Sequence, residues 1–248
     1  YAAVLLLRSL ILSLIAGGSY WLLRPEARRE PWYLWLMAQE GLGEFTFDAA
    51  DLAMFKRAAR LVLEMDSPVP TRVVDFGAGS GGDLPYILGC GLTGPLAILA
   101  VETNPFTFPA IEDEAKRLGL DIAARDAKGS ASTVASTILC IEDLADVPSA
   151  SVSLVIARRV LCSVSEQGPV LREVFRVLRP GGVFAFVEHV ADSEGSPLRL
   201  LQQVLKPLQM AFANNCNPVQ ETASAIRGCC SWAFVDVENF TLEGAVLI

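Results

Sequence analysis

The sequence has few of the residues from which many metal and nucleic-acid sites are built. Its 248 residues include one histidine, and its six cysteines show no C-x-x-C spacing, so spacing predicts neither a zinc site nor a disulfide framework. Lysine and arginine number 20 against 28 aspartate and glutamate residues. Because contacts to phosphate need basic side chains, this acidic balance argues against a nucleic-acid partner. We therefore expect no metal, no nucleic acid and reduced, space-filling thiols.

Apolar residues are abundant, and their surplus lies at the N-terminus. Hydrophobic residues make up 52% of the chain and the mean hydropathy is +0.41, which is high for a soluble enzyme. Residues 2–23 contain one charge, Arg8, and about twenty apolar residues can just span a hydrocarbon core. Tryptophan and tyrosine between positions 20 and 35 are typical of a membrane interface. Residues 1–24 are predicted to be an apolar helix that anchors the chain; a cleaved signal peptide and a buried helix are the alternatives.

A glycine-rich turn follows the first predicted strand. Residues 73–83 read VVDFGAGSGGD, so a short apolar run and an acid lead into a turn with the glycines Gly77, Gly79, Gly81 and Gly82. Glycine is required where the backbone adopts a positive φ or where a ligand approaches the backbone closely. The turn is therefore predicted to bind a ligand through its backbone.

Two acidic residues indicate which ligand the turn binds. Glu102 ends a second apolar run about twenty residues after the turn, where an acid can bind both hydroxyls of a ribose. The glycines also satisfy the dinucleotide pattern G-x-G-x-x-G, so a nicotinamide-dependent oxidoreductase is an alternative. Asp75, two residues before the first glycine, would repel a pyrophosphate and attract a cation. S-adenosylmethionine, which carries an ammonium and a sulfonium, is the cofactor we predict; a simple loop-capping role for Asp75 remains the alternative.

The rest of the chain alternates between apolar runs typical of strands and helical spacings. Strands are expected at 72–76, 96–102, 137–141, 152–157, 183–187 and 232–237, and helices at 45–65, 109–118, 167–178, 198–212 and 219–226. This alternation predicts an α/β fold, with a doubly wound, mostly parallel sheet and helices on both faces. In such a sheet, ligands bind outside the carboxyl ends of the strands.

Several motifs resemble those of class I S-adenosylmethionine-dependent methyltransferases. They are DFGAGSGG, the acid Glu102, the pair Glu142–Asp143 after the third expected strand, and VLRPGG before the fifth. The segments RRVLCSV, LREVFRVLRPGG, FVEHV, LQQVLKP and CNPVQET more narrowly resemble the membrane-anchored methyltransferase-like 7 family of alkyl-thiol S-methyltransferases.

This resemblance implies a domain division and a cofactor site. Residues 25–70 would be a linker with N-terminal helices, and residues 71–248 a Rossmann-like methyltransferase domain with a substrate cap around 196–228. Asp75 and the backbone of Gly77, Gly79 and Gly81 would hold the methionine part of the cofactor, and Glu102 the ribose. Glu142 and Asp143 would lie at the adenine. The family also implies a membrane-associated protein with its catalytic domain in the cytosol, on endoplasmic reticulum or lipid droplets.

The expected reaction is methyl transfer to a small apolar acceptor, a thiol by resemblance. His189 follows Glu188 at a strand end and could remove the acceptor's proton while Glu188 orients it; a structural histidine is the alternative. Cys162 is interpreted as a packing residue, because the sequence has no second histidine to activate it. Ser153 and Gln220 depart from the family pattern. Other reactions therefore remain open, namely O- or C-methylation of a small molecule or lipid, as does a membrane-bound protein that binds the cofactor without turnover.

Overall fold

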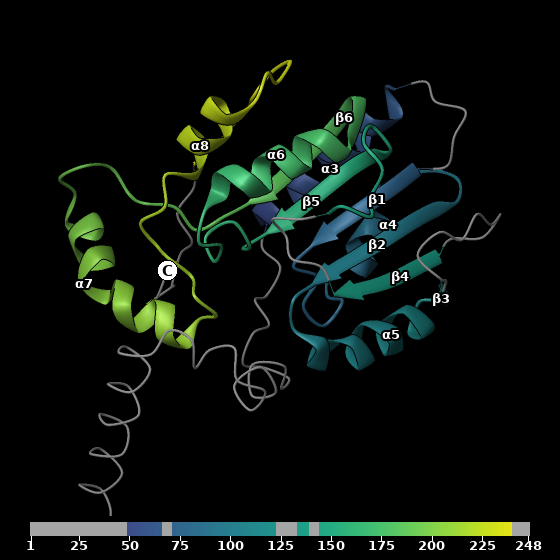
Figure 1. The fold of residues 1–248 in the computed structure, drawn as a ribbon, viewed down its shortest axis with the longest axis horizontal. Coiled ribbons are helices and arrows are strands. Elements are labelled where there is room, and N and C mark those ends of the chain that lie inside the picture. Colours follow the sequence, from purple (N-terminus) through teal and green to yellow (C-terminus); the bar gives the residue numbers. More distant parts are fainter. Residues whose placement is uncertain (1–48, 66–70, 123–132, 139–143, 240–248) are drawn as a thin grey trace, which may run out of the picture.

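The computed structural model describes residues 49–65, 71–122, 133–138 and 144–239, and within them a single parallel sheet. The strand order is β3-β4-β2-β1-β5-β6 (Figure 1). The strands are β1 (Thr71–Phe76), β2 (Leu96–Glu102), β3 (Asp121–Ile122), β4 (Thr133–Ile138), β5 (Val152–Arg158) and β6 (Leu178–Val187). The anchor predicted at 1–24, the linker up to residue 48, and the pair Glu142–Asp143 lie outside the described residues.

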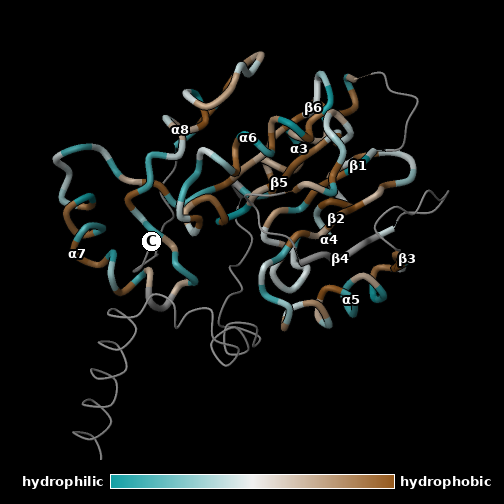
Figure 2. The backbone as a smooth tube through the Cα atoms, viewed as in Figure 1, coloured by the Kyte–Doolittle hydropathy of each residue, from teal (hydrophilic) through white to brown (hydrophobic). Residues whose placement is uncertain are grey.

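Two separate hydrophobic cores cover the two faces of the sheet. Alternate side chains of a strand point to opposite faces, so Val74 packs with the helix residues Val170 and Val174 while Val73 packs with Phe55 and Ile111. Figure 2 shows the central strands as the most hydrophobic part of the fold. The helices are α3 (Ala49–Leu63), α4 (Leu84–Gly89), α5 (Phe108–Arg117), α6 (Gln167–Val177), α7 (Pro197–Phe212) and α8 (Thr222–Cys229), with a 3-10 turn at Pro105–Thr107. The expected α/β fold with helices on both faces is confirmed.

The strand order reverses at β1, and this reversal determines where the site lies. β1 pairs with β2 on one side and with β5 on the other, so that Phe76 lies level with both Val101 and Ala157. Loops that leave the carboxyl ends of such neighbours diverge, which opens a crevice for a ligand. The glycine turn after β1, Glu102 at the end of β2 and the loop after β5 therefore meet at this point.

The starts of β4 and β6 and one expected strand differ from the prediction, and α8 runs over Thr222–Cys229 rather than 219–226. β4 begins at Thr133 rather than 137, because pairing with Ala97 recruits small polar residues that have no strand pattern of their own. β6 begins at Leu178, since Val152 pairs with Leu178 before a register shift that takes up the Arg179–Gly182 turn residues. The strand expected at 232–237 is wrong: this stretch has no regular structure. Trp232 instead makes a T-shaped ring contact with Phe175, and its indole N–H donates to the carbonyl of Ile226.

Helix α7 lies beyond the carboxyl ends of the strands, away from the two cores (Figure 1). Its start is fixed by Pro197 and by Ser196, whose hydroxyl accepts from the backbone N–H of Arg199. Large apolar side chains on this helix are exposed, namely Leu200, Leu201, Val204 and Leu208. Within the part of the chain that the structure describes, no helix is both long and apolar enough to cross a membrane.

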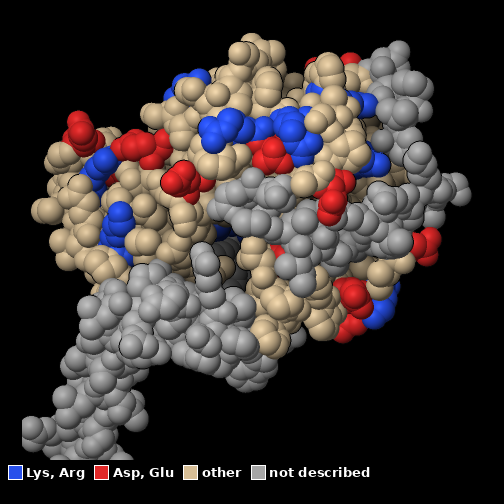
Figure 3. All heavy atoms as spheres, in the orientation of Figure 1, with Lys and Arg blue, Asp and Glu red and all other residues tan. Residues whose placement is uncertain are grey.

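Charged side chains of both signs are interleaved on the face of the molecule seen in Figure 3. Among the charged residues of the chain, some form ion pairs along a helix, such as Arg176 with Glu173 on α6. Others join separate elements, as where Arg199 on α7 reaches Glu221 at the start of α8. Ion pairs that remain partly open to solvent contribute about 1 kcal/mol or less each, so the two cores dominate the stability of the fold.

Candidate functional site

The glycine turn after β1 has the backbone geometry that its sequence predicts. Gly77, Gly79 and Gly81 all have positive φ, at 67°, 54° and 88°. The N–H of Gly77 donates to the carbonyl of Val101, which ties the turn to β2. A methyl group at Gly77 would lie 2.4 Å from the Val160 side chain, whereas one at Gly79 would meet only a carbonyl oxygen at 4.0 Å. The turn is thus packed on one side and open above Gly79, as a backbone cradle for a ligand requires.

Glu102 links the end of β2 to the glycine turn. One carboxylate oxygen accepts from the N–H of Gly79, and the other accepts from the N–H groups of Thr103 and Asn104. These bonds fix the carboxylate in an almost buried position beside the turn. A carboxylate oxygen can accept more than one hydrogen bond, so Glu102 retains capacity for the two hydroxyls of a ribose.

Asp75 is a buried carboxylate at the end of β1. Its side chain is fully buried, and neither carboxylate oxygen has a hydrogen-bond partner among the described residues. Burial raises the pKa of Asp75 well above its usual value, and the nearby carboxylate of Asp83 raises the pKa further. Asp83 itself is bound by the Arg158 guanidinium, at 2.8 Å. A buried carboxylate without a donor costs stability, and such a cost is typical of a site whose partner is a ligand.

These three features fit S-adenosylmethionine. An ammonium group would give Asp75 the donors that it lacks, the open backbone at Gly79 would admit the chain of the amino acid, and Glu102 would accept from the ribose. Glu142 and Asp143, expected at the adenine, lie outside the described residues. Their role and the roles of the other cofactor residues remain predictions from the sequence.

The carboxylate of Glu188 holds the loop that follows β5. Its two oxygens accept from three consecutive backbone N–H groups, those of Val160, Leu161 and Cys162, at 2.8–3.1 Å. Burial raises the pKa of Glu188 to about 7, while these amide bonds oppose the increase. We therefore assign Glu188 to positioning this loop; its expected action on His189 stays a prediction.

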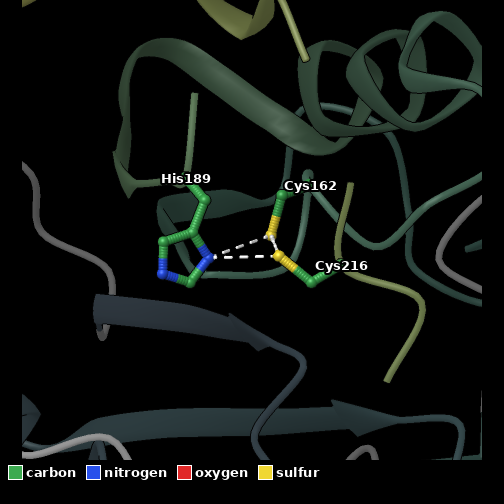
Figure 4. A group of neighbouring side chains, drawn as sticks. All are labelled: Cys162, His189 and Cys216. Carbon is green, nitrogen blue, oxygen red and sulfur yellow. Dashed lines mark hydrogen bonds between the residues drawn. The ribbon is translucent and has the colours of Figure 1, made fainter. Parts of the chain in front are cut away.

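His189 lies against two sulfur atoms (Figure 4). Its Nδ1 atom is 3.6 Å from Sγ of Cys162 and 3.3 Å from Sγ of Cys216, and the two sulfurs are 3.4 Å apart. Cys162 follows β5, His189 follows β6, and Cys216 lies between α7 and α8. Both cysteines are buried, whereas His189 is partly exposed.

The hydrogen bonds of this cluster shift the pKa values of the two thiols in opposite directions. The bond between the two sulfurs, followed by the bond to His189, lowers the pKa of Cys216 to about 5, against the effect of burial. The same sulfur–sulfur bond and burial raise the pKa of Cys162 well above its usual value. The pKa of Cys216 is thus shifted towards the thiolate, which is the form of cysteine that binds metals and attacks electrophiles.

The segment that carries Cys216 is joined directly to the loop after β5. The N–H of Asn217 donates to the carbonyl of Cys162, and the side-chain amide of Asn215 donates to the carbonyl of Ser163. Asn214 and Asn215 adopt positive φ, which brings the chain sharply out of α7. Part of the stretch predicted as a substrate cap thus lies against the strand ends.

Sequence reasoning identified His189 but not its neighbours. The sequence favours a packing role for Cys162 and gives no signal that Cys216 belongs to the site. The three residues are spaced by 27 positions each, which matches no spacing rule for metal or catalytic cysteines. They come together because the ends of β5 and β6 lie next to the segment that follows α7.

Comparison with known proteins supports the expected class of domain. Residues 74–186 match a family model described as a methyltransferase domain. Among curated proteins, the chain is 44% identical over 85 residues to the human protein Thiol S-methyltransferase TMT1A, and 40% identical over 81 residues to rat Thiol S-methyltransferase TMT1B. These matches cover 34% and 33% of this chain. They span about a third of each relative's length, 35% and 33% respectively.

Solved structures show the likeness of the fold. The chain superimposes on the crystal structure of a proposed methyltransferase from Bacillus halodurans with a TM-score of 0.53 and 12% identity, covering 73% of this chain and 68% of that one. A proposed sarcosine dimethylglycine methyltransferase from Galdieria sulphuraria gives a TM-score of 0.50 at 16% identity, covering 72% and 57%. At these identities the comparison concerns the arrangement of strands and helices alone.

Proposed function

We propose that this chain, whose residues 74–186 match a family model described as a methyltransferase domain, transfers the methyl group of S-adenosylmethionine to a small apolar thiol. The observation that carries the proposal is the pairing of an unpartnered buried carboxylate, Asp75, with the open glycine backbone at the strand-order reversal. A cationic nucleoside cofactor satisfies both features, whereas the pyrophosphate of a nicotinamide cofactor would lie against the negative charge of Asp75.

The described residues divide into a cofactor side and an acceptor side. Asp75 accepts hydrogen bonds from the ammonium group, and Glu102 accepts from the ribose. On the acceptor side, Glu188 fixes the loop that presents Cys162, and His189 lies between this loop and the segment of Cys216. Val160 connects the two sides, because it packs against Gly77 and its N–H donates to Glu188.

The bound cofactor supplies a methyl group on a positively charged sulfur. The acceptor must reach that carbon in line with the bond that breaks, so the protein contributes chiefly by holding the acceptor in place. A thiol must also lose its proton, and a free thiol has a pKa of about 8.5. The cluster of His189 with two cysteines is therefore where we place the deprotonation of the acceptor.

A thiol acceptor is supported by the matched relatives, which are named thiol S-methyltransferases. It is also supported by the cluster chemistry, because sulfur and imidazole groups suit the binding and deprotonation of another thiol. A phenol, with a pKa of about 10, holds its proton more tightly than a thiol and is harder to deprotonate at neutral pH.

Methyl transfer can be measured directly with the full chain, reduced and in detergent. We expect label from methyl-labelled cofactor to appear on small apolar thiols in preference to phenols and lipids of similar size. Label on phenols or lipids alone would redirect the proposal to O- or C-methylation. Tight cofactor binding without transfer to any member of the panel would favour a protein that binds the cofactor without turnover.

We also propose that the enzyme acts at a cytosolic membrane surface, on endoplasmic reticulum or lipid droplets. The apolar residues 2–23 support this placement, and so do the exposed apolar side chains on α7. We expect the full chain to remain with membranes after a carbonate wash and a chain lacking residues 1–24 to be released. Release of the full chain by the wash would contradict the anchor.

A further inference from the structure

We propose that Cys162, His189 and Cys216 bind a zinc ion, with one position left open for the thiol acceptor. All three donor atoms lie within 4.8 Å of one another. The role of the ion in catalysis rests on the function proposed above, but the site itself rests on this geometry alone.

The distances match a tetrahedral zinc site. With zinc bonds of about 2.3 Å to sulfur and about 2.0 Å to nitrogen, two sulfur ligands are about 3.8 Å apart and a sulfur and a nitrogen about 3.5 Å apart. The observed separations are 3.4 Å between the sulfurs, and 3.6 Å and 3.3 Å from Nδ1 of His189 to Cys162 and Cys216. All three are within a few tenths of an ångström of the tetrahedral values. The set of two cysteines and one histidine is also one that catalytic zinc sites use, with the fourth position open.

The surrounding chain holds Cys162 and the segment of Cys216 in place before any ion arrives. Glu188 binds the backbone N–H of Cys162, and the N–H of Asn217, next to Cys216, donates to the carbonyl of Cys162. His189 adjoins Glu188 in the chain. Ligands fixed in this way lose little conformational freedom on binding, which favours affinity for a metal.

A disulfide is the rival use of two buried cysteines, and the distance argues against it. A disulfide requires about 2.05 Å between the sulfurs, whereas these sulfurs are 3.4 Å apart with Nδ1 of His189 beside both. Cys229 and Cys230 form a second pair of neighbouring cysteines, with their sulfurs 3.0 Å apart. Among the described residues, the group of three possible metal ligands consists of Cys162, His189 and Cys216 and includes neither Cys229 nor Cys230.

A zinc ion in this position would activate the acceptor. The acceptor thiol binds the open position and releases its proton to solvent, and its sulfur remains a nucleophilic thiolate at neutral pH. That sulfur forms a bond to the methyl carbon as the carbon–sulfonium bond breaks, and the electron pair of the broken bond stays on the cofactor sulfur. The products are a neutral thioether, which is a weaker ligand and leaves, and S-adenosylhomocysteine.

The test is the metal content of the full chain, purified under reducing conditions and dialysed after exposure to zinc. We expect about one zinc per chain in the wild type and less than a tenth of that in Cys216→Ser and in His189→Ala. Cys230→Ser, the matched control from the second cysteine pair, should retain the full content. Cobalt in place of zinc should give thiolate-to-cobalt charge-transfer absorption that Cys216→Ser weakens and Cys230→Ser preserves.

Binding of S-adenosylhomocysteine by each variant serves as the check that it is folded. Wild-type protein without zinc or cobalt, or equal metal content in Cys216→Ser and Cys230→Ser, would overturn the proposal. A Cys162–Cys216 disulfide in peptide maps, with no metal bound after reduction, would overturn it in favour of a redox pair. Binding of zinc without any methyl transfer would support the zinc site and contradict the proposed function. Methyl transfer by protein that contains no metal would support the proposed function and contradict the zinc site.

Discussion

Replacing Asp75 with asparagine is expected to weaken S-adenosylhomocysteine binding by about 30-fold or more and to raise the melting temperature of the free protein. The loss of affinity follows because removing one partner of a buried, hydrogen-bonded charge pair costs about 2 kcal/mol or more. The gain in stability follows because Asp75 is fully buried, has no donor among the described residues and lies beside Asp83. Each 1 kcal/mol gained should raise the melting temperature by about 2–4 °C.

Both effects should depend on pH in a defined direction. The raised pKa of Asp75 in the folded protein means that this group destabilises the free protein progressively as pH rises from the unfolded value, about 3.9, to the raised folded value. Binding of an ammonium requires the ionised carboxylate, so wild-type affinity should increase over the same rise in pH. In Asp75→Asn, the contributions of residue 75 to the pH dependence of stability and of affinity should both be absent.

Asp113→Asn is the matched control for this substitution. Asp113 lies on α5 with most of its side chain exposed, paired only loosely with Lys116, so affinity and melting temperature should both stay close to wild type. If Asp75→Asn behaved like Asp113→Asn in calorimetry and thermal unfolding, Asp75 would be a structural residue of the turn. Titration of both proteins with S-adenosylhomocysteine over a pH series makes the comparison.

Replacing His189 with alanine is expected to slow methyl transfer to a thiol by about 100-fold or more near neutral pH. His189 acts on the proton of the acceptor, directly as a base or by holding the cation that acidifies it. In either case the loss should shrink as pH rises towards the pKa of a free thiol, about 8.5, because solvent then supplies the thiolate. The rate as a function of pH from 6 to 9 provides the measurement.

Cofactor binding separates this role from a folding defect. The affinity of His189→Ala for S-adenosylhomocysteine should remain near that of wild type, since the described cofactor residues lie at the ends of β1 and β2. Cys230→Ser should keep both rate and affinity. An unchanged rate for His189→Ala across the pH range would reduce His189 to a structural residue and leave positioning as the source of catalysis.

The cofactor side of the site could be predicted from sequence because its chemistry is local. The positive φ of Gly77, Gly79 and Gly81 is a property of the turn itself, and the run of apolar residues before Glu102 defines a buried strand with an acid at its end. What the sequence did not reveal is that Asp75 has no partner among the described residues and that Glu102 braces Gly79. Those facts depend on how two neighbouring strands align.

The acceptor side could be predicted only in part, because it is assembled from distant segments. His189 was identified by its place after a strand, but Cys216 depends on the turn of Asn214 and Asn215 out of α7. The role of Glu188 in orienting its neighbour stays a prediction, and the bonds of its carboxylate to the backbone N–H groups from Val160 to Cys162 are not evident from the sequence. The sequence predicts the start of β4 too late for a similar reason. Residues 133–136 have no strand pattern of their own and form a strand because they pair with β2.

Calorimetric titration of the full chain with S-adenosylhomocysteine and, separately, with NADH tests most directly that the crevice beside Asp75 binds a cationic, phosphate-free nucleoside. We expect saturable binding of S-adenosylhomocysteine at one site per chain, weakened about 30-fold or more in Asp75→Asn and kept in Asp113→Asn, with no binding of NADH at the same concentrations. Tight binding of NADH together with no binding of S-adenosylhomocysteine would contradict the assignment of the crevice and the methyl transfer derived from it.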